Sequence, residues 1–590
     1  MKYLSFTIAY VLLMPFPALA QGTPPNSRLD SIAESYFEEQ LAQNPTLATS
    51  IGDKRYNDRY EVPFAASYRE RAKQRVGRYL AHVQNIDRNA LDDAHRITYD
   101  VFTYNLRTTL EGFRFPSHLQ PLNQFFNFTA GFAQLGSGTG NHPFKTVKDY
   151  DDFLKRMADF SRAVDTAIVN MRQGVRAGVV QPRVLMEQTL PQLSAHIVDD
   201  AQTSLFYGPI KNMPATFGEA DRARLTNAYT AAIRDVVVPA FRRLRDFVRD
   251  EYIPKARTTF GYLALPDGRA WYEYQVRQST TTKLTPQEVH RTGLAEVERI
   301  HGEMRSVLQR VGFKGTLSEF FVAINADAAQ HYKNREEMIG DFRASKAHID
   351  ALTDRIFDIK PRADYEIRPV EPFRERSASG GQYNAASPDG SRPGIVYINT
   401  YNAQERSRYG MESLLLHEGS PGHHFQISVQ RELTNLPRLR RFSGFTAFSE
   451  GWGLYAESLG KELGVYTDPY QYYGMLDGEL WRAIRLVLDT GIHDQGWTRQ
   501  QAIDYAKLNS SASMTTIVSE VERFAAIPGQ ALAYKIGQMK IRALRTEAER
   551  RLGPRFDIKA FHRAVLDGGA LPLDVLQAKI QRWIAERETK

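Results

Sequence analysis

Apolar side chains recur at helical spacing through most of this chain, and this pattern constrains the fold more strongly than any other feature of the sequence. Segments 29–43, 151–178 and 225–252 each place apolar residues every three or four positions. Capping boxes mark two further helix starts, one at Thr285 and one at Thr498. The sequence therefore predicts a mainly α-helical protein.

One window interrupts this helical pattern. From about residue 365 to residue 402, Gly, Pro and Ser become frequent and short β-rich runs such as GIVYINT appear. We expect a small β-sheet in this window, directly before a helix that carries several histidines. No internal repeat or low-complexity linker divides the rest of the chain. We expect two lobes beside a cleft, an N-terminal helical lobe over residues 21–280 and a C-terminal lobe over 281–590.

The first twenty residues have the features of a secretory signal peptide. Lys2 precedes an apolar run from Ile8 to Phe16, and small residues precede the expected cleavage site after Ala20. The run is short and no basic stop-transfer cluster follows it, so we expect no membrane anchor. The mature protein is expected to be periplasmic or secreted.

Composition limits the kind of site that the chain can build. The sequence has no cysteine, so the protein folds without disulfides and any metal site must use His, Asp and Glu. The net charge of +8 becomes +7 without Lys2 (8 − 1), and no strip of interleaved basic and aromatic residues appears. We therefore expect no nucleic-acid partner. The sequence leaves the oligomeric state undetermined.

The segment LLLHEGSPGHHFQ, residues 414–426, begins like the zinc-binding helix motif H-E-x-x-H. In that motif two histidines one turn apart bind zinc, and the glutamate between them deprotonates the attacking water. Here Pro421 stands where the second histidine belongs. Proline lacks the N–H that the helix needs and crowds the preceding turn, and Gly422 loosens the chain further.

Two histidines follow this break, and either could replace the missing ligand. If Pro421 and Gly422 form a two-residue bulge, His423 reaches the required position. If the helix ran straight, His424 would share a face with His417 but lie roughly 10 Å further along. That separation suits metal ligands poorly, so we prefer His423. His424 is then expected to support a ligand or to face the substrate, although the sequence alone leaves the choice open.

A downstream helix offers a third ligand. The run AFSEGWGLYAESLG contains Glu450 and Glu457, which are seven residues apart and share one helix face. We expect Glu450 to complete a site for one Zn²⁺ ion with His417 and His423, and Glu457 to orient a ligand histidine. Glu418 is the expected general base. The ordinary alternative is that these are unrelated polar residues and that Glu450 is an acid favoured at a helix start.

Further downstream, four residues fit supporting roles in hydrolysis. Tyr534 or His493 could donate a hydrogen bond to a developing oxyanion. Arg523 or Lys535 could supply the cation for a carboxylate of the substrate. Taken singly, each of the four is more often structural, because such residues are abundant in proteins.

The β-rich window adds a candidate binding element. Gly381, Gln382 and Tyr383 fit an edge strand that pairs with an extended peptide substrate. The same residues fit a surface loop equally well. The sequence favours neither interpretation.

Three motifs carry a resemblance to a known family. They are His417-Glu418-x-x-Pro421-Gly422-His423-His424-x-Gln426, Glu450-Gly451-Trp452-x-Leu454-Tyr455-x-Glu457 and Pro528-Gly529-Gln530-Ala531-x-x-Tyr534-Lys535-x-Gly537. With segments 280–304, 387–399 and 488–493, they resemble the bacterial family catalogued as domain of unknown function 885. The resemblance covers nearly the whole mature chain.

This resemblance implies a fold and an activity. Members of the family are regarded as metallopeptidase-like and similar to the glutamate-zincins, whose third zinc ligand is a glutamate on a later helix. It implies a large helical zincin-like peptidase fold with a deep cleft and a small β-sheet next to the active-site helix. It also implies that Tyr534 stabilises the oxyanion and that His493 is an accessory donor.

Together these features predict a secreted or periplasmic zinc metallopeptidase that hydrolyses peptide bonds. Two alternatives remain open. The same metal could serve a hydrolase of a non-peptide amide or ester, or the fold could belong to a metal-free binding protein or pseudoenzyme whose site is broken by Pro421. Metal content separates the last alternative from the others, and a peptide digest separates the first two.

Overall fold

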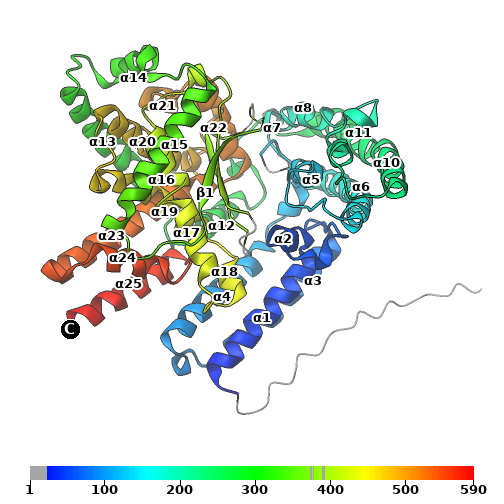
Figure 1. The fold of residues 1–590 in the computed structure, drawn as a ribbon, viewed down its shortest axis with the longest axis horizontal. Helices are drawn as coiled ribbons and strands as arrows, with labels where there is room; N and C mark the ends of the chain where they lie inside the picture. The colour runs from blue at the N-terminus through cyan, green and yellow to red at the C-terminus, as the bar shows by residue number, and fades with distance from the viewer. Residues whose placement is uncertain (1–22, 126, 372–374, 376–377, 388–391, 590) are drawn as a thin grey trace, which may run out of the picture.

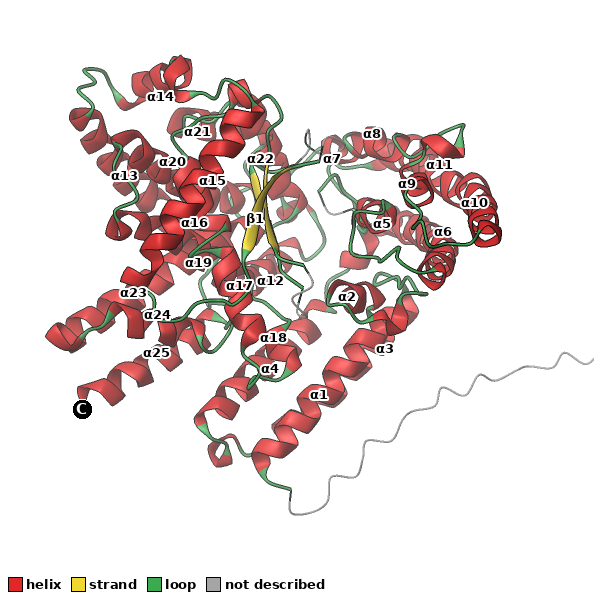
Figure 2. Cartoon of the chain, viewed as in Figure 1, coloured by secondary structure: helices red, strands yellow, loops and turns green. Residues whose placement is uncertain are grey.

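Helices dominate the computed structural model, which describes residues 23–125, 127–371, 375, 378–387 and 392–589 (Figures 1 and 2). The prediction of a mainly α-helical protein is confirmed, and both predicted capping boxes form. The expected signal peptide over residues 1–20 lies outside the described residues. Among the helices that the structure describes, none is both long and apolar enough to cross a bilayer.

The first half of the chain contributes twelve α-helices to the described part of the structure. They are α1 (Pro25–Gln43), α2 (Pro45–Ser50), α3 (Ala66–Gln84), α4 (Asp93–Gly112), α5 (Phe128–Gly136), α6 (Val147–Ala177), α7 (Arg183–Glu187), α8 (Thr189–Ser194), α9 (Gly208–Lys211), α10 (Glu219–Ala232), α11 (Val238–Phe247) and α12 (Gly268–Thr280). Helices α5 to α11 lie to one side of the molecule in Figure 1, across from the sheet.

The second half supplies the remaining α-helices. They are α13 (Pro286–Arg310), α14 (Leu317–Ala326), α15 (Arg335–Leu352), α16 (Met411–Glu418), α17 (His423–Glu432), α18 (Arg438–Arg441), α19 (Thr446–Leu463), α20 (Pro469–His493), α21 (Arg499–Asn509), α22 (Met514–Ala526), α23 (Ala533–Leu552), α24 (Ile558–Leu566) and α25 (Leu573–Glu588). Helix α19 packs against both α16 and α23, so it connects the predicted metal helix with the helix that carries Tyr534.

The predicted β-sheet forms within the expected window. Its strands are β1 (Tyr365–Pro369), β2 (Gly381–Asn384) and β3 (Gly394–Ile398), in the order β1-β3-β2. Strand β3 pairs with β1 in parallel and with β2 in antiparallel orientation. Residues 381–384 are therefore an edge strand and not a loop, and this strand packs beside α16.

The hydrophobic cores do not follow a division of the chain at residue 280. Residues between Leu122 and Ala256 form a separate core within α5 to α11. By contrast, Val101 of α4 and Trp271 of α12 are part of the large core around α16, α19 and α23. The N-terminal half thus contributes a helical unit with its own core, a smaller core around α1 and α3, and helices α4 and α12 to the body that holds the candidate site.

Two glycines allow α19 and α23 to cross closely. A Cβ at Gly451 would lie 2.5 Å from the backbone of Gly537, and one at Gly537 would lie 1.9 Å from the carbonyl oxygen of Ala447. Neither distance is compatible with a side chain. The crossing places Glu450 of α19 and Tyr534 of α23 near each other, because each lies within one turn of its glycine.

Candidate metal centre

Three side chains from three helices converge to form a group that could hold a metal ion. Among the described residues, His417, His423 and Glu450 each offer a ligand atom, and these atoms lie within 4.8 Å of one another. Glu450 Oε2 lies 3.4 Å from His417 Nε2 and 3.3 Å from His423 Nε2. Ligands about 2.1 Å from one tetrahedral zinc ion would be separated by about 3.4 Å. The donor types and their spacing therefore fit a zinc ion.

The helix break at Pro421 produces this convergence. Helix α16 ends at Glu418 and α17 begins at His423, so four residues leave the helical path where a two-residue bulge was predicted. A Cβ at Gly422 would lie 2.0 Å from the carbonyl oxygen of His417, so glycine is required there. The indole of Trp452 donates a hydrogen bond of 2.8 Å to the Pro421 carbonyl and connects the break to α19.

Glu457 supports His417 from the side away from Glu450. Its Oε1 lies 2.7 Å from His417 Nδ1, and its Oε2 accepts a hydrogen bond of 2.6 Å from Ser413. Arg482 lies 3.6 Å from the same carboxylate. This arrangement directs His417 Nε2 toward Glu450 and fixes the orientation of the ring, as a carboxylate behind a metal-binding histidine does.

The electrostatics of the group favour a positive charge between its members. Burial alone would lower the pKa of His417, but contacts with Glu450 and Glu457 outweigh this effect and raise the pKa to about 10. Burial would raise the pKa of Glu450, yet His423 and His417 hold it well below its usual value. A divalent cation is the charge that such a set of ligands commonly binds.

Glu418 lies where α16 meets the edge strand. It is buried, and its Cγ would be 3.2 Å from a Cβ placed at Gly381. Only a glycine at position 381 leaves room for both Leu414 and Glu418 against β2. The predicted general base therefore lies against the strand predicted to bind substrate and directly follows His417 in α16.

His424 faces the sheet instead of the metal group. Its Nδ1 lies 3.1 Å from the Tyr383 hydroxyl, and its ring packs 4.5 Å from that of Tyr365. Burial lowers the pKa of His424 to about 4, so the ring is neutral. Consecutive residues in a helix point about 100° apart. His423 is therefore the residue that joins the group, and His424 helps to attach α17 to β1 and β2.

Tyr383 and Gln382 point to opposite sides of β2, as the pleat requires. Tyr383 reaches inward to His424 and Ser428. Gln382 and Asn384 line a cavity of about 470 Å³ between the sheet and the region around α5. Of the residues of this strand that were predicted to contact substrate, only Gln382 lines this cavity.

Tyr534 lies beside the metal group on α23. The guanidinium carbon of Arg485 is 4.8 Å from the centre of its ring. Burial raises the pKa of Tyr534, the charge of Glu450 adds to the rise, and Arg485 and Arg523 oppose it. Tyr534 therefore remains protonated at neutral pH and can donate a hydrogen bond.

Arg485 and Arg523 share the carboxylate of Glu520. Arg485 Nη2 donates to it at 2.9 Å and Arg523 Nε at 2.8 Å, while Arg523 also donates to Gln530 at 2.8 Å. Arg523 was predicted to bind a carboxylate of the substrate, but its donors are engaged within the protein. Arg485 and Glu520 were not predicted, although the three-residue spacing of Glu520 and Arg523 in one helix is a signal for that pair.

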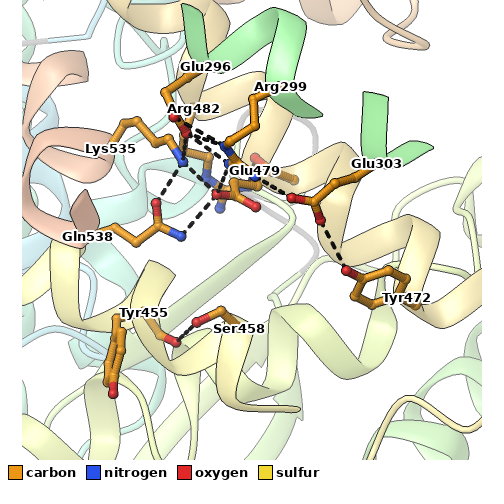
Figure 3. A network of polar contacts seen from close by, with 11 residues as sticks. Glu296, Arg299, Glu303, Tyr455, Ser458, Tyr472, Glu479, Arg482, Lys535 and Gln538 are labelled. Atoms are coloured by element: carbon orange, nitrogen blue, oxygen red, sulfur yellow. Dashed lines mark hydrogen bonds and ion pairs between the residues drawn. The ribbon is translucent and has the colours of Figure 1, made fainter. Parts of the chain in front are cut away.

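Lys535 belongs to a buried ionic network and not to a substrate site (Figure 3). Its ammonium group donates to Glu479 at 2.5 Å and to Gln538 at 2.7 Å, and it lies 2.8 Å from Glu296. Only 1% of the residue is exposed. Its predicted role in substrate binding is therefore replaced by a structural one, because neighbouring helices already satisfy its charge.

His493 is also structural. Its Nδ1 accepts a hydrogen bond of 3.1 Å from the backbone N–H of Tyr262, and its Nε2 donates one of 3.0 Å to the carbonyl of Phe524. The ring stacks on Tyr272, and burial lowers its pKa to about 3. Because both nitrogens are occupied, His493 has no donor left for an oxyanion, and the predicted accessory role is not supported.

The fold and the site define a class, a mainly helical protein with a His-His-Glu group that could hold a metal ion, on helices next to a small sheet. The chain belongs to the family described as "Bacterial protein of unknown function (DUF885)", whose model matches residues 45–580. No curated protein matches the chain.

Two solved structures have a similar fold. "The crystal structure of the putative lipoprotein from Colwellia psychrerythraea" is 28% identical in sequence and has a TM-score of 0.89, with 95% of this chain and 99% of that chain covered. A "putative lipoprotein of unknown function from Shewanella oneidensis" is 18% identical and has a TM-score of 0.70, with coverage of 93% and 99%. The second likeness concerns the fold alone.

Proposed function

We propose that the protein is an extracytoplasmic zinc metallopeptidase. The convergence of His417, His423 and Glu450, with Glu418 next to an edge strand, carries this proposal. Two imidazoles and one carboxylate are a ligand set typical of catalytic zinc, which leaves a coordination position open. A zinc ion held by these residues would polarise a carbonyl group and lower the pKa of water.

The residues of the chain have separate tasks in this proposal. Glu418 takes the proton from the attacking water and transfers it to the leaving amine. Tyr534 donates a hydrogen bond to the substrate oxygen as negative charge develops on it. The outer edge of β2 pairs with the extended backbone of the peptide and presents the scissile bond to Glu418.

The expected location rests on separate observations. Residues 1–20 have the sequence features of a signal peptide. The similar structure from Colwellia is named as a putative lipoprotein. We infer that the protein acts in the periplasm or outside the cell.

Substitution of Glu418 tests the proposed chemistry. Glu418→Gln keeps the size of the side chain but cannot accept the proton, so peptide cleavage should fall by about 10²-fold or more while zinc content stays the same. Cleavage of a mixed peptide library, followed by mass spectrometry, measures the activity, and elemental analysis measures the zinc. An unchanged cleavage rate would contradict the role of Glu418. Hydrolysis of non-peptide esters or amides with no peptide cleavage would favour the other hydrolase class.

A further inference from the structure

A large cavity lies near the helices that carry Glu450 and Tyr534. Its volume is about 1030 Å³, at the upper end of the range for ligand pockets. Gly444, Phe445 and Thr446 form part of its wall, and Glu450 lies one turn after Thr446 in α19. Gln530, which accepts a hydrogen bond from Arg523, contributes another part just before Tyr534. The cavity therefore reaches the first turn of α19, the helix that carries Glu450, and the turn that precedes α23, the helix that carries Tyr534.

Helical faces build much of the remaining wall. On α12, Trp271, Tyr274, Gln275 and Gln278 follow the i, i+3, i+4, i+7 spacing of one helix face, and all four line the cavity. Helix α4 adds Tyr104 and its neighbours. Aromatic rings and side-chain amides thus alternate along walls that rigid elements hold in place.

The described residues that line this cavity carry almost no charge. They include no Asp, Glu or Lys, and their titratable cations are Arg69 and His118. Arg69 donates to the carbonyl oxygens of Phe113 and Phe115. Burial, with a smaller effect of Arg69, lowers the pKa of His118 to about 4. At neutral pH the cavity therefore offers no carboxylate to a cationic ligand, and its one guanidinium is engaged with the backbone.

Some polar atoms of this wall lack a partner within the protein. Gln120 Nε2 and His118 Nδ1 are buried without a hydrogen-bond partner among the described residues. Buried polar groups are usually paired, so such atoms mark places where a ligand or water is expected. The side-chain amides of Gln275 and Gln278 on α12 line the cavity and can pair with the N–H and C=O groups of a polypeptide backbone.

We propose that this cavity binds an uncharged segment of the peptide substrate adjacent to the scissile bond. The inference rests on the proposed function, since it takes the ligand to be the peptide that the metal group cleaves. Aromatic side chains contact apolar residues of the substrate, and the amides pair with its backbone. A cationic side chain in this segment would lose its hydration without gaining a counter-ion, and an anionic one would meet only Arg69, whose Nη2 already donates to two backbone carbonyls. Both effects disfavour binding of a charged segment.

Two experiments test this inference: binding of peptides that differ at a single position, and substitution of Gln278 in the cavity wall by a charged residue. Zinc-loaded Glu418→Gln protein is titrated with fluorescent peptides that differ only by Gln, Phe, Glu or Lys at one position at a time. We expect Glu or Lys on one side of the scissile bond to weaken binding at least 10-fold. Adding Gln278→Glu should shift the ratio of Lys-peptide to Glu-peptide affinity at least 10-fold toward Lys, and Gln278→Lys should shift it the opposite way.

The control is Gln309→Glu, an exposed position on α13 that does not line the cavity. It should leave the ratio unchanged. Equal affinity for charged and neutral peptides would overturn the inference. So would a ratio of Lys-peptide to Glu-peptide affinity that does not change in the Gln278 variants. Binding of a neutral N-acetylated oligosaccharide with no binding of peptides would also overturn it. Failure of the wild-type enzyme to cleave any peptide would instead contradict the proposed function, because the binding assay does not require cleavage.

Discussion

At the scale of single residues, the candidate metal ligands were more predictable from the sequence than the hydrogen-bond partners of the surrounding side chains. His417, Glu418, His423 and Glu450 follow from a motif and from spacing along one helix face, and the three expected ligands come together in the structure. The roles predicted for His424, His493 and Lys535 are not supported. Their partners come from segments distant in sequence, and residue type alone does not show whether a donor is already satisfied.

Glu457 allows a prediction at this scale. Because its carboxylate holds His417 Nδ1 at 2.7 Å, Glu457→Gln should weaken zinc binding by about 10- to 100-fold. Competition with a chelating dye measures the affinity. The control is Glu462→Gln on the same helix, whose carboxylate pairs with Arg545 at the surface. Equal zinc affinities for the two variants would contradict the supporting role of Glu457.

At the scale of elements, helices and the small sheet were predictable because periodicity and capping are local properties of the sequence. The details of the break at Pro421 were not. A two-residue bulge was predicted, whereas α16 ends and α17 starts after four residues. The course of the chain here depends on the close approach of Gly422 to the carbonyl oxygens of Leu416 and His417 and on the hydrogen bond from Trp452 of α19. The second contact comes from a later helix, which local periodicity does not reveal.

A substitution at Gly453 tests how closely α19 approaches His417 of α16. A Cβ at this position would lie 2.8 Å from His417 Cε1 and 3.0 Å from both ring nitrogens. Gly453→Ala should displace the ring, reduce zinc affinity by about 10-fold or more and lower the free energy of unfolding by about 1–3 kcal/mol. Gly340→Ala on α15 is the control, since its Cβ would meet nothing within 4 Å. Normal zinc binding by Gly453→Ala would show that the contact is not restrictive.

At the scale of the whole molecule, the sequence did not predict how segments distant in the chain pack together. The large cavity and the distribution of the cores arise from contacts between segments far apart in the chain, such as α4 and α12 with α19. The ionic network around Glu479 is a further example, since it joins α13, α20 and α23 through Glu296, Lys535 and Gln538 (Figure 3). No local pattern shows that these helices meet.

This network should make stability depend on pH. Burial would raise the pKa of Glu479, but Lys535 and Arg299 lower it from 4.5 to about 2. A carboxyl group with a lowered pKa stabilises the fold above its unfolded pKa, and this contribution is lost as the pH falls toward the folded value. Glu479→Gln should therefore lower the free energy of unfolding by about 3 kcal/mol at pH 7. The difference from wild type should shrink between pH 4.5 and pH 2.

Urea unfolding at a series of pH values measures this difference. Glu303→Gln is a suitable control, because that carboxylate pairs with Arg299 at the edge of the same network and its side chain is 42% exposed. Its effect should stay below about 1 kcal/mol at all pH values. If the free energy of unfolding of Glu479→Gln stayed below that of wild type by the same amount at every pH, the lowered pKa assigned to Glu479 would be contradicted.

The zinc content of purified protein tests the central claim most directly. Elemental analysis should find about one zinc ion per chain in the wild type and in His424→Gln, and little in His423→Ala, since His423 and not His424 joins His417 and Glu450. Zinc retained by His423→Ala but lost from His424→Gln would reverse the choice of ligand. A wild-type protein that binds no zinc would contradict the metallopeptidase account as a whole.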